Sequence, residues 1–283
     1  MKLVRFGEKG QEKPGVLMED GSIIDVSTHI SDFDADFLRE DGLERLHIWL
    51  REYGDMVPRV GEEVRLGMPI ANPSKVLCIG LNFLDHCVEL NDPIPNEPVL
   101  FTKAVSALTG PDDPIELPPG STHTDWEVEL AFVIKQQAKN VKEHEAFPYV
   151  AGYTIMNDVS ERDFQKNHDG QWVKGKSYDT FAPLGPMLVT PNEIDDVYQL
   201  KMVTKVNDVL MQDGSTANMI FKIPYLVSYL SRFMTLMPGD VISTGTPPGV
   251  GAGKQPPQFL REGDVVEMEI AGLGTQRHAV ISA

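Results

Sequence analysis

The first fifty residues change from the alternating pattern of strands to the periodicity of a helix. Apolar runs at 15–18 and 23–26 flank the pair Asp20-Gly21, and Asp-Gly between apolar runs is a strong hairpin signal. Residues 34–53 then show helical spacing, with charged residues between the apolar positions Leu43, Leu46, Trp49, Leu50 and Tyr53. The pattern predicts a small β unit followed by a helix.

Proline and glycine interrupt this pattern after residue 58. We expect a boundary near residue 70 that separates a small N-terminal α/β module (1–70) from a main domain (71–283). In the main domain, runs rich in β-branched and aromatic residues predict strands at 75–80, 98–103, 126–134, 150–158 and, as a pair, within 198–213. The proline-rich residues 91–120 predict a loop apart from 98–103, and the apolar stripe of 220–234 predicts a helix packed on the core.

Composition and charge narrow the class of protein. Of the 283 residues, 41% are hydrophobic and 24% are charged, which is ordinary for a globular protein with a large core. The net charge of −17 argues against nucleic acid or an anionic membrane as a partner. Only Cys78 and Cys87 occur, and no apolar signal or membrane-spanning run is present, so we expect a cytoplasmic protein.

Three carboxylates converge in the predicted strands. Side chains alternate along a strand, so Glu127 and Glu129 point to one face, and Asp158 ends the run at 150–158. Neighbouring carboxylates repel one another unless a cation lies between them, and hard oxygen ligands without His or Cys favour Mg²⁺ or Mn²⁺ over zinc. The alternative is a solvated strand face with ordinary surface acids, and the spacing alone leaves it open.

Further candidate residues lie on predicted helical turns. His86 and Glu89 are three residues apart in 83–90, where a carboxylate can fix the tautomer of an imidazole and raise its basicity; the alternative is a surface pair. Arg162 and Gln165 are also one turn apart and could face one cavity, where an arginine suits a substrate carboxylate; the alternative is a surface Arg162 paired with a neighbouring acid.

Lysines and a glycine-rich loop complete the set of candidates. One of Lys174 and Lys176 could point inward, but the pattern does not say which, and Lys103 is either functional or a solvated edge charge. The loop 245–254 lacks the first glycine and the Ser or Thr of a phosphate-binding loop. It is better interpreted as a rigid loop that offers backbone N–H groups and the hydroxyl of Thr246.

At these motifs the chain resembles the fumarylacetoacetate hydrolase family from about Lys75 to the C-terminus. The resemblance is carried, in order, by CIGLNFLDHCVE, DWEVEL, NDVSERDFQ, KGKSYDTFAPLGP, LMPGDVISTGTPPGVG and FLREGD. It is particularly close to bacterial members that cleave 2,4-diketo-3-deoxy sugar acids and are often labelled ureidoglycolate lyases. The resemblance implies an α+β, strand-rich fold built on a mixed β-sheet roll, a Mg²⁺ or Mn²⁺ site, and a homodimer.

The resemblance also implies roles for single residues. Glu127, Glu129 and Asp158 match the metal ligands, and His86 and Glu89 match a catalytic dyad on a lid that orders over the substrate. Lys176 matches the family lysine, and Arg162, Gln165 and Thr246 match positions that contact the substrate.

We therefore expect an enzyme that hydrolyses a carbon–carbon bond of a 2,4-dioxo acid, with Lys176, aided by Thr246 or loop amides, stabilising the oxyanion. Oxaloacetate decarboxylation, elimination of urea from ureidoglycolate, and hydration or isomerisation of a dienoate are alternatives on the same site. A non-catalytic, metal-stabilised binding protein is a further alternative. Specificity is expected to reside in the loops 91–97 and 166–171.

Overall fold

The computed structural model describes residues 1–61 and 63–283, and its N-terminal part forms the predicted hairpin and helices. Strands β1 (Lys2–Phe6), β2 (Lys13–Leu17) and β3 (Ile23–Asp25) pair antiparallel in chain order. The carboxylate of Asp20 closes the hairpin turn, because it accepts hydrogen bonds from both the backbone N–H and the hydroxyl of Ser22. Helices α1 (Ala35–Arg39) and α2 (Gly42–Tyr53) follow.

The largest sheet runs through both halves of the chain, because β1 pairs antiparallel with β14 (Ala182–Val189). Its strand order is β4-β3-β2-β1-β14-β12-β11-β17-β6-β7, with β5 beside β1 and β8 beside β14. The sheet is mixed, since β17 and β6 are parallel whereas most other neighbours are antiparallel. Its remaining strands are β4 (Arg59–Val60), β5 (Leu66–Gly67), β6 (Val76–Gly80), β7 (Val99–Lys103), β8 (Leu108–Thr109), β11 (Val128–Ile134), β12 (Val150–Asn157) and β17 (Val241–Ser243).

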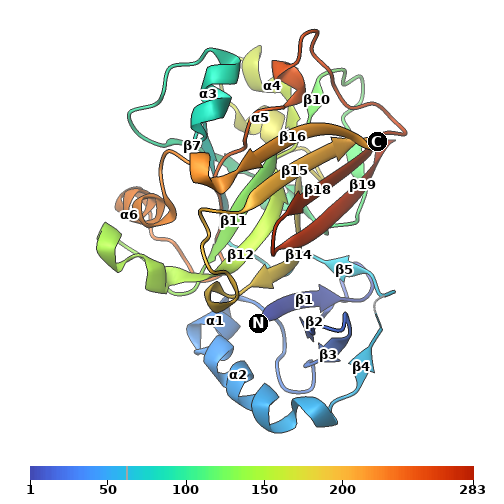
Figure 1. Cartoon of the computed structure of the whole chain (residues 1–283), viewed down its shortest axis with the longest axis vertical. Helices are drawn as coiled ribbons and strands as arrows, with labels where there is room; N and C mark the ends of the chain where they lie inside the picture. The colour runs from blue at the N-terminus through green and yellow to red at the C-terminus, as the bar shows by residue number, and fades with distance from the viewer. Residues whose placement is uncertain (62) are drawn as a thin grey trace.

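The boundary predicted near residue 70 falls between β5 and β6, and the N-terminal module lies below the rest of the molecule in Figure 1. The division into two domains stays a prediction, since the two parts share one sheet. The segment 91–120 is not a simple loop, because it contains β8 and β9 (Ile115–Leu117) besides the predicted strand at 98–103.

A second sheet packs across β11, β12 and β14 and gives the fold its roll (Figure 1). Its order is β16-β15-β18-β19-β9, and the predicted pair within 198–213 forms its hairpin edge. Asn207 and Asp208 turn this hairpin with positive φ angles of 51° and 64°, which asparagine and aspartate tolerate better than other side chains. The expected strand-rich mixed roll is confirmed. The strands are β15 (Lys201–Val206), β16 (Val209–Ser215), β18 (Val265–Ile270) and β19 (Gly274–Ser282), and a separate ribbon joins β10 (Thr124–Asp125) to β13 (Ser160–Glu161).

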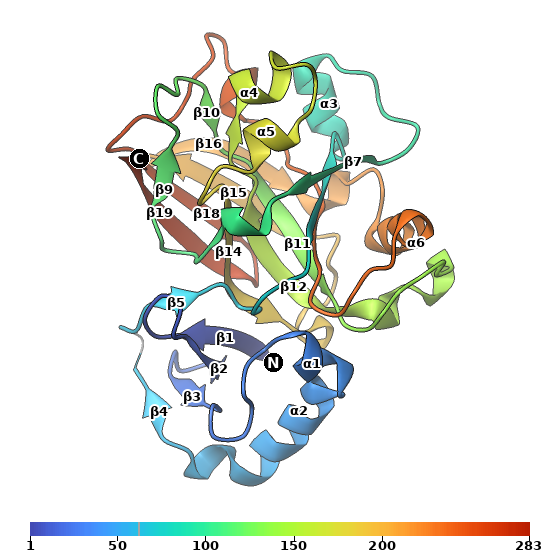
Figure 2. The same cartoon turned by 180° about the vertical axis from the view of Figure 1, so that it is seen from behind.

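Three short helices gather at one end of the sheets in both views: α3 (Leu84–Leu90), α4 (Arg162–Lys166) and α5 (Val173–Lys176) (Figures 1 and 2). Strand β12 ends and β11 begins at this same end, which places the acidic motifs beneath the helices. Helix α6 (Ile223–Phe233) carries the predicted apolar stripe, of which Ile223, Leu226, Val227 and Leu230 are buried. Phe233 is 62% exposed, and Met234, beyond the end of the helix, is partly buried. Short 3₁₀ turns lie at Gly54–Met56, Val105–Ala107, Glu143–Glu145, Phe147–Tyr149, Pro191–Glu193, Thr216–Asn218 and Gly251–Gly253.

Within residues 1–61 and 63–283, every helix is too short or too polar to cross a bilayer.

Candidate metal centre and active site

Glu127, Glu129 and Asp158 lie close together because β11 and β12 are antiparallel, so that the start of β11 lies beside the end of β12. Glu129 stands opposite Met156 in the register, and the backbone N–H of Asp158 donates to the carbonyl of Glu127 at 2.9 Å. One carboxylate oxygen from each of the three residues lies within 4.8 Å of the other two. All three side chains are buried, so the alternative of solvated surface acids is wrong.

Glu129 is the unusual member of this triad. Its carboxylate accepts hydrogen bonds from the hydroxyl of Ser243 at 2.5 Å and from the backbone N–H of Gly245 at 3.0 Å. Among the described residues it forms no ion pair, although it is only 2% exposed. Burial, together with the charges of Asp158 and Glu127, raises the pKa of Glu129 well above its usual range. A buried carboxylate without a cation, facing two others, fits a divalent metal ion with oxygen ligands.

Lys176, the last residue of α5, forms ion pairs with both Glu127 and Asp158. Its ammonium lies 2.7 Å from an oxygen of each carboxylate and 5.0 Å from the ring centroid of Phe101. Burial acts against a charged lysine, but the two carboxylates outweigh it and raise the pKa of Lys176. Lys174 is exposed, so the geometry agrees with the resemblance, which singled out Lys176 of the two lysines.

Lys103 is a site residue that the sequence left undecided. Its ammonium lies 2.5 Å from the second oxygen of Asp158 and donates to the carbonyl of Val159 at 3.0 Å. Burial lowers its pKa, partly offset by the charge of Asp158. On β7, Phe101 and Lys103 are buried whereas Thr102 is exposed. Side chains alternate along a strand, so an apolar residue two positions before Lys103 was a signal in the sequence that Lys103 points inward.

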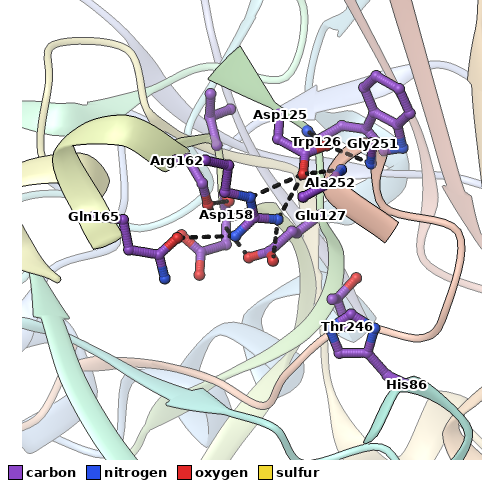
Figure 3. Close-up of polar contacts among 12 residues, drawn as sticks. His86, Asp125, Trp126, Glu127, Asp158, Arg162, Gln165, Thr246, Gly251 and Ala252 are labelled. Atoms are coloured by element: carbon purple, nitrogen blue, oxygen red, sulfur yellow. Dashed lines mark hydrogen bonds and ion pairs between the residues drawn. The ribbon is translucent and has the colours of Figure 1, made fainter. Parts of the chain in front are cut away.

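Arg162 binds the protein's own carboxylates, as Figure 3 shows. Its Nε donates to Asp125 at 2.9 Å, one terminal nitrogen donates to Glu127 at 2.8 Å, and the other donates to Gln165 at 3.1 Å. Burial disfavours the charged form of Arg162, but the carboxylates of Glu127 and Asp125 outweigh it and raise the pKa of Arg162. Burial likewise disfavours the charged form of Glu127, but the cations Arg162 and Lys176 lower the pKa of Glu127. The alternative of a surface Arg162 is wrong; contact of Arg162 and Gln165 with substrate stays a prediction.

The predicted dyad forms on α3. The Nδ1 atom of His86 lies 2.9 Å from one carboxylate oxygen of Glu89, and the backbone N–H of Gly249 donates to the other oxygen at 2.8 Å. His86 is 5% exposed, so it is not part of a surface pair. Both oxygens of Glu89 are thus engaged, and the Nε2 atom of His86 is the ring nitrogen that Glu89 does not contact.

Thr246 lies at the wall of the site with its hydroxyl already paired. The hydroxyl donates to the carbonyl of Val128 at 2.9 Å and accepts from the side-chain amide of Gln212 at 2.8 Å. Its single proton is therefore used within the protein. Its contact with substrate stays a prediction.

One cavity of about 90 Å³ brings these groups together. The buried residues at and behind the cavity comprise four acidic side chains (Asp125, Glu127, Glu129 and Asp158) and three basic ones (Lys103, Arg162 and Lys176). A divalent ion that replaces a proton on Glu129 would leave one positive charge, which a monoanionic substrate would neutralise. The cavity is lined by all nine predicted site residues except Glu89, together with Leu81, Leu90, Asp92, Phe101, Lys166 and Trp172 among others.

Comparison with known proteins fits this arrangement. The family model described as fumarylacetoacetate (FAA) hydrolase C-terminal matches residues 75–281, which is most of the chain and the range in which the nine predicted site residues lie. The chain belongs to the fumarylacetoacetate hydrolase family. The expected family is confirmed, and with it an enzyme of the hydrolase class.

Three relatives show how the fumarylacetoacetate hydrolase family extends over the whole chain. A 2,4-didehydro-3-deoxy-L-rhamnonate hydrolase of Sphingomonas sp. (strain SKA58) is 48% identical over 282 residues, 99% of this chain and 96% of that protein. A fumarylacetoacetate hydrolase from Exiguobacterium antarcticum has a TM-score of 0.85 at 38% identity. A maleylpyruvate hydrolase from Sphingobium sp. SYK-6, in complex with manganese(II) ion and pyruvate, has a TM-score of 0.84 at 28% identity. Both structural matches cover 100% of either chain.

Proposed function

We propose that this protein hydrolyses a carbon–carbon bond of a 2,4-dioxo acid, with a 2,4-diketo-3-deoxy sugar acid as its substrate class. The observation that carries the proposal is the buried triad of Glu127, Glu129 and Asp158 beside both a lysine and a His–Glu dyad. The 48% identity to a hydrolase of a didehydro-deoxy sugar acid supports the substrate class. The products are pyruvate, or a related 2-oxo acid, and a second acid.

Mg²⁺ or Mn²⁺ is the proposed ion, held by Glu127, Glu129 and Asp158, and the manganese complex of a relative supports this choice. When bound, the ion supplies a Lewis acid for the 2-oxo and carboxylate groups of the substrate. Lys103 and Lys176 hold the carboxylate of Asp158 in place, and Lys176 also holds that of Glu127.

The dyad supplies the base. Nε2 of His86 accepts the proton of a water that attacks the 4-carbonyl, and Glu89 orients the imidazole through Nδ1. The ammonium of Lys176 stabilises the negative charge of the oxyanion. The bond between carbons 3 and 4 then breaks, and carbon 3 takes up the proton that the base had accepted. The backbone N–H groups of Gly245, Gly249, Gly251 and Ala252 each donate their single hydrogen to a carboxylate, whereas Lys176 has a third hydrogen beyond the two given to Glu127 and Asp158 and is therefore the proposed donor.

A substrate panel tests the function. Metal-stripped protein, with and without added Mg²⁺ or Mn²⁺, is assayed on acylpyruvates, a diketo-deoxy sugar acid, oxaloacetate, ureidoglycolate and a dienoate. We expect the sugar acid to be cleaved only with metal, because the ion would supply the Lewis acid for the 2-oxo group. Preferential turnover of oxaloacetate or ureidoglycolate would favour the lyase alternatives. Turnover of a dienoate would favour the isomerase or hydratase alternative. If no compound is turned over, a non-catalytic binding protein would be favoured. Full activity without metal would contradict the role of the ion.

Replacement of Glu89 tests the dyad. Glu89→Gln directs an amide N–H₂ either at Nδ1–H of His86 or at the N–H of Gly249, so the imidazole loses its fixed orientation. We expect kcat to fall by about 100-fold or more, the range of general acid–base catalysis. Mn²⁺ affinity, measured by calorimetry, should not change, because Glu89 is no part of the triad. A kcat near that of the wild type would remove the dyad from the mechanism.

Specificity, cellular location and oligomeric state are further parts of this proposal. Asp92, in the loop 91–97, and Lys166, the last residue of α4 and the first of the segment 166–171, line the cavity, which supports these two segments as the source of specificity. The two cysteines, Cys78 and Cys87, are unpaired and buried, which supports a reducing compartment such as the cytoplasm. A homodimer follows the expectation from the family, and a solution mass equal to the 31.4 kDa of one chain would contradict it.

A further inference from the structure

The loop after β17 donates its backbone N–H groups to three acidic side chains of the site. Gly245 donates to the metal ligand Glu129 at 3.0 Å, and Gly249 donates to Glu89 of the dyad at 2.8 Å. Gly251 and Ala252 donate to the two oxygens of Asp125 at 2.6 and 3.0 Å. The loop resembles an anion-binding nest, but the anions that occupy it are carboxylates of the same chain.

Glycine is required where this loop passes close to other backbone. Gly249 has a φ angle of +105°, and a Cβ there would lie 2.0 Å from the carbonyl oxygen of Met211. At Gly251 a Cβ would lie 1.9 Å from the carbonyl oxygen of Gln258 and 2.7 Å from Asp125 itself. The path of the loop therefore depends on the absence of side chains at these points.

Asp125 joins this loop to the metal ligands without touching the cavity. It is fully buried, and its Oδ1 accepts from Gly251 and from its own neighbour Trp126, while its Oδ2 accepts from Ala252 and from Arg162. Arg162 in turn donates to Glu127, as the dashed lines of Figure 3 show. The cavity lining includes Arg162, Glu127 and Ala252 but not Asp125, so Asp125 acts only through these neighbours.

We infer that Asp125 is a positioning residue that fixes the metal ligand Glu127 and the base-orienting Glu89 relative to each other. On one side it holds Arg162, which orients Glu127; on the other it holds the end of the loop whose Gly249 N–H orients Glu89. A change at Asp125 is expected to affect metal affinity through Glu127. It is also expected to affect turnover, because the reaction requires the substrate and the attacking water to be correctly oriented relative to each other.

Asp125→Asn tests this inference with little change of volume. An amide nitrogen in place of Oδ2 would point hydrogen atoms at the Nε–H of Arg162 and the N–H of Ala252, two donors that then lose their acceptor. We expect the Kd for Mn²⁺, measured by electron paramagnetic resonance without substrate, to rise about 10-fold. At saturating metal, kcat should fall about 10-fold or more, with a smaller change in KM.

Asp240→Asn is the matched control. Asp240 is also fully buried, accepts from the backbone N–H of Met237 and the hydroxyl of Ser74, and pairs with Lys75, but it lies outside the cavity. We expect this variant to lower the melting temperature while leaving the Kd for Mn²⁺ and kcat unchanged. Equal effects of both substitutions on Kd and kcat would show that Asp125 serves only the fold and would overturn the inference.

A double variant separates the effect of Asp125 through Arg162 and Glu127 from its effect through the loop and Glu89. If Asp125 acts on turnover through the loop and Glu89, then Asp125→Asn should reduce kcat much less in a Glu89→Gln background than in the wild type. Full additivity of the two losses would contradict this connection. Should Asp125→Asn not fold, Asp125→Glu, which keeps the acceptors but shifts them, provides the same comparison of Kd and kcat.

The kcat measurements rest on the proposed function, whereas the Mn²⁺ measurement does not. If no substrate of the panel is turned over, the proposed hydrolase fails, and an unchanged Mn²⁺ affinity in Asp125→Asn still refutes the inference independently.

Discussion

Glu129→Gln is expected to abolish the binding of the divalent ion and, in the metal-free protein, to raise thermal stability. The buried carboxylate of Glu129 has no cationic partner among the described residues, and burial with two neighbouring carboxylates raises its pKa. A glutamine keeps an oxygen for Ser243 and Gly245 and turns an N–H₂ group toward the other acids. Because a glutamine is neutral without taking up a proton on folding, the substitution should stabilise the metal-free fold on the order of 1 kcal/mol. Calorimetric unfolding with and without Mn²⁺ measures both effects.

Glu127→Gln is the matched control, because the same chemical change meets a different environment. Glu127 forms ion pairs with both Arg162 and Lys176, so its loss leaves these buried cations with fewer partners. The free energy of unfolding of the metal-free protein should fall by about 3–5 kcal/mol. Both variants should lose the metal-induced rise in melting temperature, but the metal-free midpoints should move in opposite directions. A lower midpoint for both, or retained Mn²⁺ binding in Glu129→Gln, would falsify the assignment of Glu129.

Lys176→Met is expected to reduce kcat by about 100- to 1,000-fold, the usual loss when an oxyanion donor is removed. Methionine fills much of the same volume beside Phe101 but carries no charge. Because the ammonium competes with the proposed ion for the negative charge of Glu127 and Asp158, its removal should leave Mn²⁺ affinity equal or tighter. Steady-state kinetics and Mn²⁺ titration together check this opposite response.

Lys174→Met is the control for this experiment, two residues earlier in the same short helix. Lys174 is exposed, and its ammonium donates to the carbonyl of His168. We expect its kcat to stay within about two-fold of the wild type, because surface substitutions away from special features change little. If both lysine variants lost activity equally, the effect would belong to α5 as a whole and not to the ammonium of Lys176.

Local periodicity was enough to predict much of the site. Alternation along one strand predicted that Glu127 and Glu129 face the same way, and spacing of three predicted the contact of His86 with Glu89. The two residues of each pair are two or three positions apart, so the local backbone geometry determines their relative orientation. The strand at 126–134 begins in fact at Val128, because the N–H of Glu127 donates to the side chain of Asn157 and not to a strand partner.

Contacts between distant segments could not be predicted in this way. Lys103 reaches Asp158 across 55 positions, and Asp125 accepts from Gly251 across 126 positions. Whether a lysine or an aspartate is solvated or buried then depends on strands and loops that pack against it, which its own neighbours in sequence do not encode. For the same reason the sequence did not reveal that the hydroxyl of Thr246 is already paired with Val128 and Gln212.

The pairing of β1 with β14 also bears on how the enzyme can be divided. A fragment that began at residue 75, where the family match starts, would leave the backbone of Leu188 and Val189 without its neighbouring strand. Such a bare edge recruits strands from other molecules and favours aggregation. Exchange of the first 70 residues between relatives must therefore supply a strand that complements this edge, even though the chemistry lies at the opposite end of the sheets.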